Sequence, residues 1–192
     1  IYDGPTASHG PVSAPERYVL YAGRHIPEKR LLAIVPAVAL ARKHLPDLRA
    51  VITGDGPERP RLEQSITAAG LDGVITLPGF VDEATLQWLF RDALCFLLPS
   101  RREGYGLVVV EAAAHGTPSV VVADPDNAAT ELIDDGINGV VAATASASDL
   151  ASAILRVNNA GVELRQSTAA WFAHNAEGLS LAGSLDRVQA AY

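Results

Sequence analysis

Two glutamates, Glu103 and Glu111, lie eight positions apart in an otherwise apolar stretch, SRREGYGLVVVEAAAHGTPSVVV (residues 100–122). A carboxylate accepts two hydroxyl hydrogen bonds, so either side chain suits the vicinal diol of a ribose or another sugar. A carboxylate can also counter positive charge that develops at an anomeric carbon. The dipole of a helix favours acids at its amino terminus as well, so a purely structural role stays open for both residues.

The segment between the two acids predicts an anion site. Gly104 and Gly106 leave the backbone free to bend close to a ligand. If a helix begins near Gly106, the amides of Leu107 and Val108 lack acceptors within the helix and are available to an anion. Glu111 then lies about one turn beyond Leu107 on the same helix face, beside the ribose of a diphosphate held on those amides.

Two cations follow the first apolar run of the chain, in YAGRHIPEKR. Arg24 and Lys29 lie five residues apart in a loop, where each can give a diphosphate a charge-assisted hydrogen bond, worth about 1.5–3 kcal/mol. The alternative is a solvated basic face at a helix start, although cations at that end oppose the helix dipole. A later turn, LPGFVDEATL, could offer the backbone of Phe80 and Val81 to a flat base, or simply end a strand.

A third turn, VITGDGPERPRLEQ, contains Gly54 and Gly56. A lone Gly-x-Gly is weak evidence for a ligand, because glycines commonly mark tight turns. Neither this turn nor the first has the full Gly-x-Gly-x-x-Gly pattern, which disfavours a nicotinamide dehydrogenase.

The bulk composition limits the partners of the chain. Its 192 residues carry a formal net charge of −7, and 48% are hydrophobic against 19% charged, which predicts a folded domain. An acidic chain argues against nucleic acid and anionic membrane as main partners. The single cysteine, Cys95, excludes an internal disulfide and a cysteine zinc site, and its apolar surroundings predict a buried thiol. The five histidines have no metal-ligand spacing, so we expect no metal.

No apolar run reaches the roughly 18 residues that span a bilayer, and no signal peptide opens the chain. We therefore expect a cytoplasmic protein. The chain contains no methionine, so Ile1 is not a natural translation start, and we expect a fragment or a processed product.

Short apolar runs alternate with segments of helical length and period. The runs suit strands buried on both faces, as in a parallel sheet, and they cover residues 18–22, 49–53, 74–77, 93–98, 119–123 and 139–142. The clearest helical segments between them cover residues 31–45, 58–69, 82–91 and 107–115. This alternation predicts a doubly wound, Rossmann-like α/β sheet of about six parallel strands. Ligands of such sheets bind where strands lead into helices.

The two ends of the chain differ from this repeating part. Residues 1–17 contain three prolines and little periodicity, so we interpret them as a linker between domains. Residues 18–157 form the predicted sheet domain, with a helix start in the Ala/Ser-rich patch near 142–153. Residues 158–192 predict trailing helices of the same domain, at 162–174 and 181–192.

Six blocks in order resemble the family-four retaining glycosyltransferases, two-domain enzymes of GT-B architecture. The signature block E-x(7)-E resembles EGYGLVVVEAAAHGTPSVV, from Glu103 through Glu111. The other resembling stretches are the linker start IYDG, the phosphate turn GRHIPEK, then GDGP, PGFV and DDGINGVV. The resemblance covers nearly the whole chain and implies its carboxy-terminal, donor-binding half.

The resemblance also implies roles for the residues at the predicted turns. Arg24 and Lys29 would hold the diphosphate of a nucleotide sugar, helped by the amides of the helix start. Glu111 would bind the ribose, and the backbone near Val81 the base. Glu103 would contact the donor sugar as the catalytic residue. The remaining binding positions are those of the loop and helix start, Gly104, Tyr105, Gly106, Leu107 and Val108.

The chain departs from the family pattern at several positions. Arg30 follows the phosphate-turn lysine where the family commonly has glycine, and DPDNAA (residues 124–129) replaces a more frequent glycine-rich loop. The linker reads DGPT where NGVD is common, and Ser180-Leu181 stands where Ser-Trp is common.

The implied reaction is transfer of a sugar from a UDP-, GDP- or ADP-linked donor to an acceptor with retention, without a metal or other cofactor. An amino-terminal acceptor domain is missing from these residues, so we expect nucleotide binding without turnover. That domain would bind the acceptor. An acceptor at the membrane surface, contacted peripherally through that domain, stays open. The alternatives are half of a nucleotide-sugar epimerase and a non-catalytic module that binds sugar nucleotides.

Overall fold

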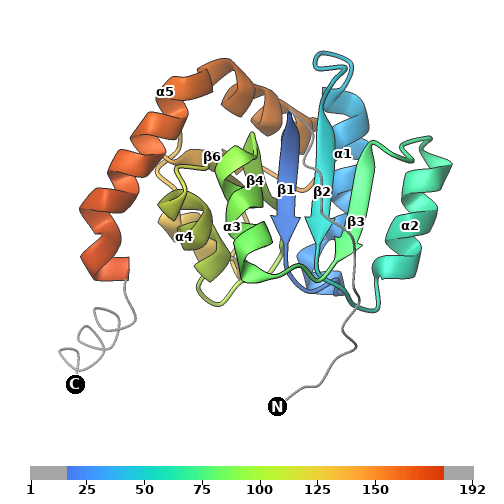
Figure 1. Cartoon of the computed structure of the whole chain (residues 1–192), viewed down its shortest axis with the longest axis horizontal. Helices are drawn as coiled ribbons and strands as arrows, with labels where there is room; N and C mark the ends of the chain where they lie inside the picture. The colour runs from blue at the N-terminus through green and yellow to red at the C-terminus, as the bar shows by residue number, and fades with distance from the viewer. Residues whose placement is uncertain (1–16, 180–192) are drawn as a thin grey trace.

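The computed structural model describes residues 17–179, which form a six-stranded sheet with helices on both faces (Figure 1). All strand pairs are parallel, in the order β3-β2-β1-β4-β5-β6. The strands are β1 Tyr18–Ala22, β2 Arg49–Thr53, β3 Ile75–Gly79, β4 Cys95–Leu98, β5 Ser119–Val122 and β6 Gly139–Ala142. The predicted fold class, a doubly wound Rossmann-like α/β sheet, is therefore confirmed.

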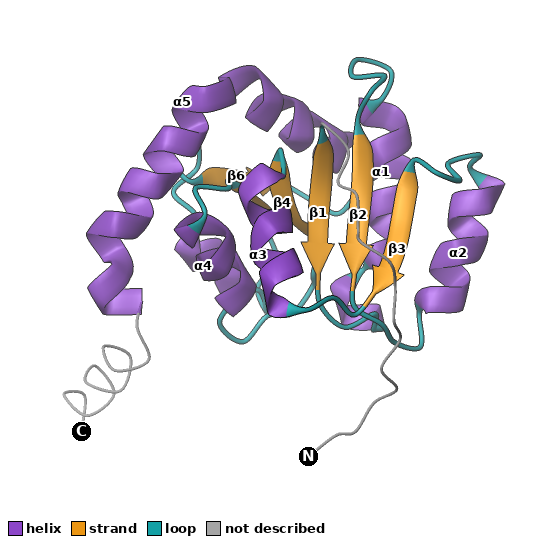
Figure 2. Ribbon diagram, in the orientation of Figure 1, coloured by secondary structure: helices purple, strands orange, loops and turns teal. Residues whose placement is uncertain are grey.

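Helices connect successive strands and cover the two faces of the sheet. In Figure 2, α3 and α4 lie in front of the sheet and α1 lies behind it. The α-helices are α1 Ile34–Ala41, α2 Arg59–Ala68, α3 Glu83–Asp92, α4 Leu107–Ala114 and α5 Ala147–Leu179. Short 3-10 helices cover Pro27–Lys29, Leu31–Ala33 and Ala128–Leu132. The central strands β1, β4 and β5 are buried at every residue, which explains why their sequences are apolar throughout.

The boundaries of several elements differ from the predicted ones for local reasons. The first helical segment, 31–45, begins as the 3-10 helix Leu31–Ala33, and α1 ends at Ala41. Strand β3 was expected at 74–77 but runs through Pro78 to Gly79. This strand lies at the edge of the sheet, where the missing N–H of a proline is tolerated. Asp82 caps α3, because its carboxylate accepts a 2.7 Å hydrogen bond from the Thr85 amide.

The carboxy-terminal part is one long helix with a break. Helix α5 runs from Ala147 to Leu179, and Gly161 inside it has non-helical backbone angles (φ 58°, ψ −137°). The helix predicted at 162–174 is therefore the second half of α5, and residue 158 lies within its first half. The predicted linker residues 1–16 and the predicted helix 181–192 lie outside the described residues. None of the helices in the described part is long and apolar enough to cross a membrane.

The strand order reverses between β1 and β4, which pair directly through Val19–Cys95 and Leu20–Phe96. The chain leaves β1 toward one face of the sheet and leaves β4 toward the other. In doubly wound sheets such a reversal opens a crevice beyond the carboxyl ends of the two strands. The turns after β1 and β4, which carry most of the predicted site residues, therefore lie where such a crevice is expected.

Candidate functional site

The turn after β1 carries both predicted phosphate-binding cations. Arg24 is exposed, and its carbonyl accepts a 3.1 Å hydrogen bond from the Tyr21 hydroxyl. Lys29 ends the 3-10 helix Pro27–Lys29, and its side chain is largely buried, with 17% exposed. The two cations thus come from one short turn at the carboxyl edge of the sheet.

An ion pair joins this turn to the loop after β4. The Lys29 ammonium donates to Oε1 of Glu103, although the two residues are 74 positions apart in the sequence. The Glu103 side chain is only 12% exposed. Both Glu103 and Arg24 act on the nearby Tyr21 hydroxyl: burial chiefly raises the pKa of Tyr21, Glu103 adds to the rise and Arg24 opposes it. Three predicted site residues, Arg24, Lys29 and Glu103, therefore lie close together.

The backbone of Glu103 is held by a third loop, which follows β5. Its amide donates to Asp126 O, and its carbonyl accepts from the Ala128 amide, both at 3.1 Å. Asn127, which is buried, holds this loop in place through its side chain. Its side-chain amide donates to Ser100 O at 3.3 Å and to Val122 O at 2.9 Å.

Sequence reasoning missed Asn127 as a site residue. The available signal was local: Asn127 caps the 3-10 helix Ala128–Leu132, and its side chain accepts from the Ala129 amide. The contacts of this loop with Glu103 could not be predicted, because they join segments more than 20 residues apart in the sequence.

The amino terminus of α4 is shaped by Gly106. This residue precedes the helix with a left-handed φ of 84°, and a Cβ there would lie 2.8 Å from the Ala129 Cβ. The amides of Leu107 and Val108 have no acceptor within the described residues. Because the first amides of a helix point outward from its end, these two are free for an anion. Gly104 has open space around it, and the neighbouring Tyr105 is 38% exposed.

Glu111 lies on the exposed side of α4, one turn beyond Leu107. Partial burial of the carboxyl group raises its pKa above the usual value, the positive field of His115 opposes the rise, and the carboxylate of Glu83 adds to it. His115 itself stacks on the ring of Phe90, with ring centroids 6.0 Å apart. A diol that donates to Glu111 would stabilise its charged form.

The turn after β3 presents an aromatic side chain to solvent. Phe80 is 71% exposed, and Val81 beside it is half-buried before the capped start of α3. This turn is tied to the turn after β2 by a 2.7 Å hydrogen bond from the Gly54 amide to Gly79 O.

The two glycines after β2 serve the packing of the turns. A Cβ on Gly54 would lie 2.0 Å from Gly23 O, and a Cβ on Gly56 would lie 2.5 Å from His25 O. Both glycines therefore allow a close backbone approach to the turn after β1. His25, fully buried, donates its amide to Asp55 O at 2.8 Å, so the turns after β1 and β2 form one unit.

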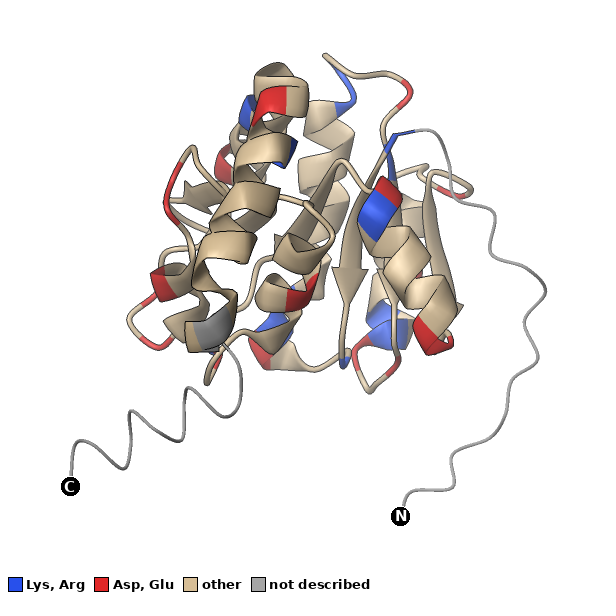
Figure 3. Ribbon diagram, turned by 60° about the vertical axis from the view of Figure 1, so that its left-hand side comes forward, with Lys and Arg blue, Asp and Glu red and all other residues tan. Residues whose placement is uncertain are grey.

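The charged residues of this region lie at the carboxyl edge of the sheet, where basic and acidic segments alternate along the lower border of the view in Figure 3. The described residues contain no group of three or more His, Cys, Asp or Glu side chains that could hold a metal ion. Cys95 lies in β4 with no exposed surface, and burial raises the pKa of its thiol to about 12, as expected for a core residue.

Comparison with known proteins identifies the family to which the chain is similar. The model of the family described as glycosyl transferases group 1 matches residues 9–170. The chain is 34% identical over 139 residues to the alpha-D-kanosaminyltransferase of Streptomyces kanamyceticus, a match that covers 72% of this chain and 36% of that protein. It is 36% identical over 147 residues to the D-inositol 3-phosphate glycosyltransferase of Arthrobacter sp. (strain FB24), covering 74% and 34%. The chain spans about a third of the length of these relatives.

Solved structures have the same fold. The pneumococcal O-GlcNAc transferase GtfA, in complex with UDP and GlcNAc, superposes with a TM-score of 0.75 at 26% identity, over 92% of this chain and 35% of that one. Anabaena HepE, in complex with UDP and glucose, gives a TM-score of 0.78 at 22% identity, over 91% and 48%. At that lower identity the HepE likeness shows the fold alone.

Proposed function

The chain belongs to the group 1 glycosyltransferases of GT-B architecture, and from this premise we propose that it is the donor-binding half of a retaining enzyme. The proposed reaction transfers a sugar from a nucleoside diphosphate sugar to an acceptor. One observation carries the proposal: the Lys29–Glu103 ion pair lies at the reversal of strand order, where the amides of Leu107 and Val108 have no acceptor in the described chain. A cation and two helix amides at one crevice suit a diphosphate.

In this proposal the diphosphate binds between the two turns. Arg24 and Lys29 approach it from the turn after β1, and the amides of Leu107 and Val108 from the start of α4. These groups supply both charge and directed hydrogen bonds, so we propose that no metal ion is needed. The diphosphate would replace Glu103 as the partner of Lys29.

Glu111 and the turn after β3 would hold the nucleoside. A ribose on a diphosphate at the start of α4 lies beside Glu111, whose carboxylate can accept from both hydroxyls. The base then faces the backbone of Val81 and the exposed ring of Phe80. We propose uridine as the first base to test, because GtfA was solved with UDP.

Glu103 would act on the donor sugar. Once the diphosphate engages Lys29, the Glu103 carboxylate is free to accept from sugar hydroxyls and to counter positive charge at the anomeric carbon. The sugar leaves the diphosphate for an acceptor hydroxyl or amine, and the diphosphate takes up the negative charge. The cations and helix amides around it stabilise that charge.

The acceptor requires a second domain. The curated relatives are about three times as long as the matched part of this chain, so we propose that acceptor binding belongs to the remainder of such a protein. Placing the acceptor against the anomeric carbon contributes about 7–11 kcal/mol to lowering a barrier. We therefore propose that residues 1–192 alone bind the nucleotide without turnover.

Calorimetric titration with UDP, GDP and ADP tests the proposal. We expect one nucleotide to bind best, with a free energy of about −4 to −6 kcal/mol. A Glu111→Ala variant should lose about 1–3 kcal/mol of that, because the ribose hydroxyls lose a charged acceptor. Glu163→Ala, at an exposed site on α5, makes the same charge change as a matched control and should bind like the parent chain.

The outcomes separate the alternatives. Equal, weak binding of all three nucleotides that Glu111→Ala leaves unchanged would contradict a donor site. A preferred nucleotide that Glu111→Ala weakens would identify the base. An epimerase half would bind the nucleotide too. A full-length protein carrying this domain distinguishes the two enzymes, because an epimerase exchanges solvent deuterium into the sugar and a glycosyltransferase transfers the sugar to an acceptor.

A further inference from the structure

Arg30 has a backbone conformation that arginine rarely adopts. With φ 49° and ψ 37°, it is the one non-glycine residue with positive φ among residues 17–179. The left-handed region crowds the Cβ of an L-residue against the backbone, so glycine would fit this position with less strain. Such a conformation persists where surrounding contacts hold it, and it often marks a functional site.

The Arg30 side chain reaches across the edge of the sheet to the loop after β5. Its Nη2 donates to Oδ2 of Asp124 at 3.1 Å, and the two residues are 94 positions apart in the sequence. The side chains are partly buried, with 31% and 16% exposed. This pair, which we call the Arg30–Asp124 clasp, joins the phosphate turn to a loop on the other side of the crevice.

The loop that Asp124 anchors is the one that holds the Glu103 backbone. The Asn127 amide donates to Asp124 O at 3.0 Å, which closes a tight turn. From this turn Asp126 O accepts the Glu103 amide, and the Ala128 amide donates to Glu103 O. The two strand-like bonds set the direction in which the Glu103 side chain leaves the backbone.

The contacts close into a ring. Arg30 holds Asp124, the loop of Asp124 holds the Glu103 backbone, the Glu103 carboxylate holds Lys29, and Lys29 is bonded to Arg30 in sequence. A diphosphate that takes Lys29 from Glu103 opens this ring at one point. Among the described residues, the clasp is then the ion pair that still joins the phosphate turn to the 124–128 loop, while the Arg101 amide donates to Glu28 O at 2.8 Å.

We propose that Arg30 and Asp124 position Glu103 for the donor sugar once the diphosphate has displaced its carboxylate from Lys29. The proposal rests on the proposed donor-binding function. Arg30 is a positioning residue: it acts through Asp124 and the 124–128 loop and does not contact the sugar. It fixes the distance between the phosphate-binding cation and the sugar-binding acid.

The competing arrangement is that Asn127 alone holds the loop. Its buried side chain bonds to Ser100 O and Val122 O and would remain in place without the clasp. Under that arrangement, loss of the clasp would leave Glu103 where it is. The two arrangements differ in what Arg30→Gln and Asp124→Asn do to the Glu103 backbone.

Amide hydrogen exchange in the ligand-free chain tests the first step. In Arg30→Gln and in Asp124→Asn, we expect the amides of Glu103 and Ala128 to exchange about fivefold faster, because their two bonds open more often. Strand β4 amides should be unchanged. Arg156→Gln removes an arginine from another ion pair, Arg156–Asp135, and serves as the matched control. The charge-reversed double variant, Arg30→Asp with Asp124→Arg, should restore slow exchange.

Calorimetry tests the second step with UDP, UDP-glucose and UDP-N-acetylglucosamine. The clasp variants should bind UDP within about twofold of the parent chain, because the protein groups proposed to bind the diphosphate are intact. They should bind the better of the two sugar nucleotides about fivefold to tenfold more weakly, because Glu103 no longer meets the sugar. The charge-reversed double variant should recover most of that affinity.

Two results would overturn the positioning role. Unchanged exchange at Glu103 and Ala128 would mean that Asn127 suffices. Faster exchange with equal losses for UDP and the sugar nucleotides would mean that the clasp supports the phosphate turn instead. A parent chain that binds no nucleotide would contradict the proposed function, and the exchange rates would then decide alone whether the clasp positions Glu103.

Discussion

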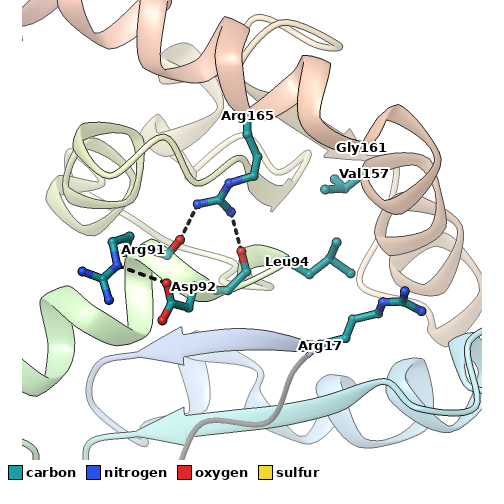
Figure 4. A pocket seen from close by; sticks show the side chains of 8 residues that line it. Arg17, Arg91, Asp92, Leu94, Val157, Gly161 and Arg165 are labelled. Carbon is teal, nitrogen blue, oxygen red and sulfur yellow. Dashed lines mark hydrogen bonds and ion pairs between the residues drawn. The ribbon is translucent and has the colours of Figure 1, made fainter.

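At the carboxyl edge of the sheet, Lys29 is paired with one carboxylate from another loop, whereas at the opposite edge Arg165 donates to backbone carbonyls (Figure 4). That opposite edge also has a pocket, of about 290 Å³, lined by Arg17, Arg91 and Arg165. Three arginines around a cavity look like an anion site on composition alone. The difference between the two edges lies in what each cation already holds.

Arg165 on α5 is fully engaged by the fold. It donates to Ala93 O at 2.6 Å, to Arg91 O, and to the Thr117 hydroxyl at 3.3 Å. These acceptors lie at the end of α3 and before β5, so the guanidinium joins three elements. A ligand could take Arg165 only by removing this donor from two backbone carbonyls and from the buried Thr117 hydroxyl. We infer that this edge is structural.

The remaining arginines of the pocket have exposed acid partners. Arg91 donates to Asp92 at 3.1 Å, and Arg17 to Asp47 at 2.9 Å. Exposed pairs of this kind contribute little to stability. At the carboxyl edge, by contrast, a partly buried ion pair, two helix amides without an acceptor among residues 17–179 and a strained arginine lie near the reversal of strand order. In the proposed function, exchangeable partners, rather than the number of charges, distinguish the edge that binds a ligand from the structural one.

The largest effect that sharpens this comparison is expected at Gly106. Gly106→Ala must keep a left-handed φ and places a Cβ 2.8 Å from the Ala129 Cβ, so we expect the free energy of unfolding to fall by about 2–4 kcal/mol. Gly104→Ala is the control two residues away, where a Cβ has nothing within 4 Å; we expect a loss under about 0.5 kcal/mol. Urea unfolding of both variants measures the difference.

The same pair of variants also probes the ligand. If the donor passes close to the loop, Gly104→Ala should keep stability but weaken binding of the preferred nucleotide. Equal destabilisation by the two variants would contradict the packing of Gly106 against Ala129.

Next in size is the effect of Arg165→Ala at the structural edge. Two carbonyls and the Thr117 hydroxyl lose a donor, so we expect a loss of about 1–3 kcal/mol in the free energy of unfolding. Arg91→Ala, in the same pocket, should cost under about 0.5 kcal/mol, because its pair with Asp92 is exposed. Urea unfolding separates the two.

The inference that the Arg165 edge is structural would be wrong if this edge bound the nucleotide. Calorimetry under conditions where Arg165→Ala is fully folded should give the parent affinity for the preferred nucleotide. A tenfold loss there would show that the pocket lined by Arg17, Arg91 and Arg165 takes part in binding.

The fold was predictable because each central strand is apolar at every residue and each turn carries glycine, proline or a cap. Runs such as 18–22 and 139–142 could be placed to the residue. Strand β3 could not, because an edge strand tolerates Pro78, which in a sequence argues against a strand. The sequence predicted a separate helix from residue 162, whereas the structure has one long helix, α5, with a break at Gly161. One glycine does not show whether a helix ends there or continues after a break.

The local structure around the candidate site was predictable one turn at a time. A glycine before an apolar helical run predicted the start of α4, and helix geometry then placed Glu111 one turn beyond Leu107. The contacts between turns were out of reach: Lys29–Glu103 and Arg30–Asp124 join residues 74 and 94 positions apart. The Gly-x-Gly at Gly54 was weak evidence for a ligand, and in the structure Gly54 packs on Gly23 O. Arg165 carries no sequence signal, because its partners are backbone carbonyls.

The smallest expected effect concerns pH. His25 is fully buried under the phosphate turn, its Nε2 lies 3.3 Å from Thr53 O, and its Nδ1 has no partner among the described residues. Burial lowers the pKa of His25; the bond to Thr53 and the carboxylates of Asp55 and Glu63 oppose this, and Arg59 adds to it.

The sign follows from linkage. Because the folded pKa of His25 is below the unfolded value of about 6.5, the unfolded chain takes up the proton first as the pH falls. The contribution of neutral His25 to stability is therefore complete above about pH 6.5 and is lost as the pH drops from there through the folded pKa. Urea unfolding between pH 8 and pH 5 should show this loss in the parent chain, and His25→Leu should show less of it.

His44→Gln is the control, because His44 is exposed. This variant should lose as much stability between pH 8 and pH 5 as the parent chain. Should His25→Leu fold poorly, an NMR titration of the His25 ring in the parent chain reads the same quantity directly. A ring that titrates at or above pH 6.5 would contradict the burial argument. It would also mean that the phosphate turn gains a positive charge in mild acid, which should strengthen diphosphate binding there and leave the Arg165 edge unaffected.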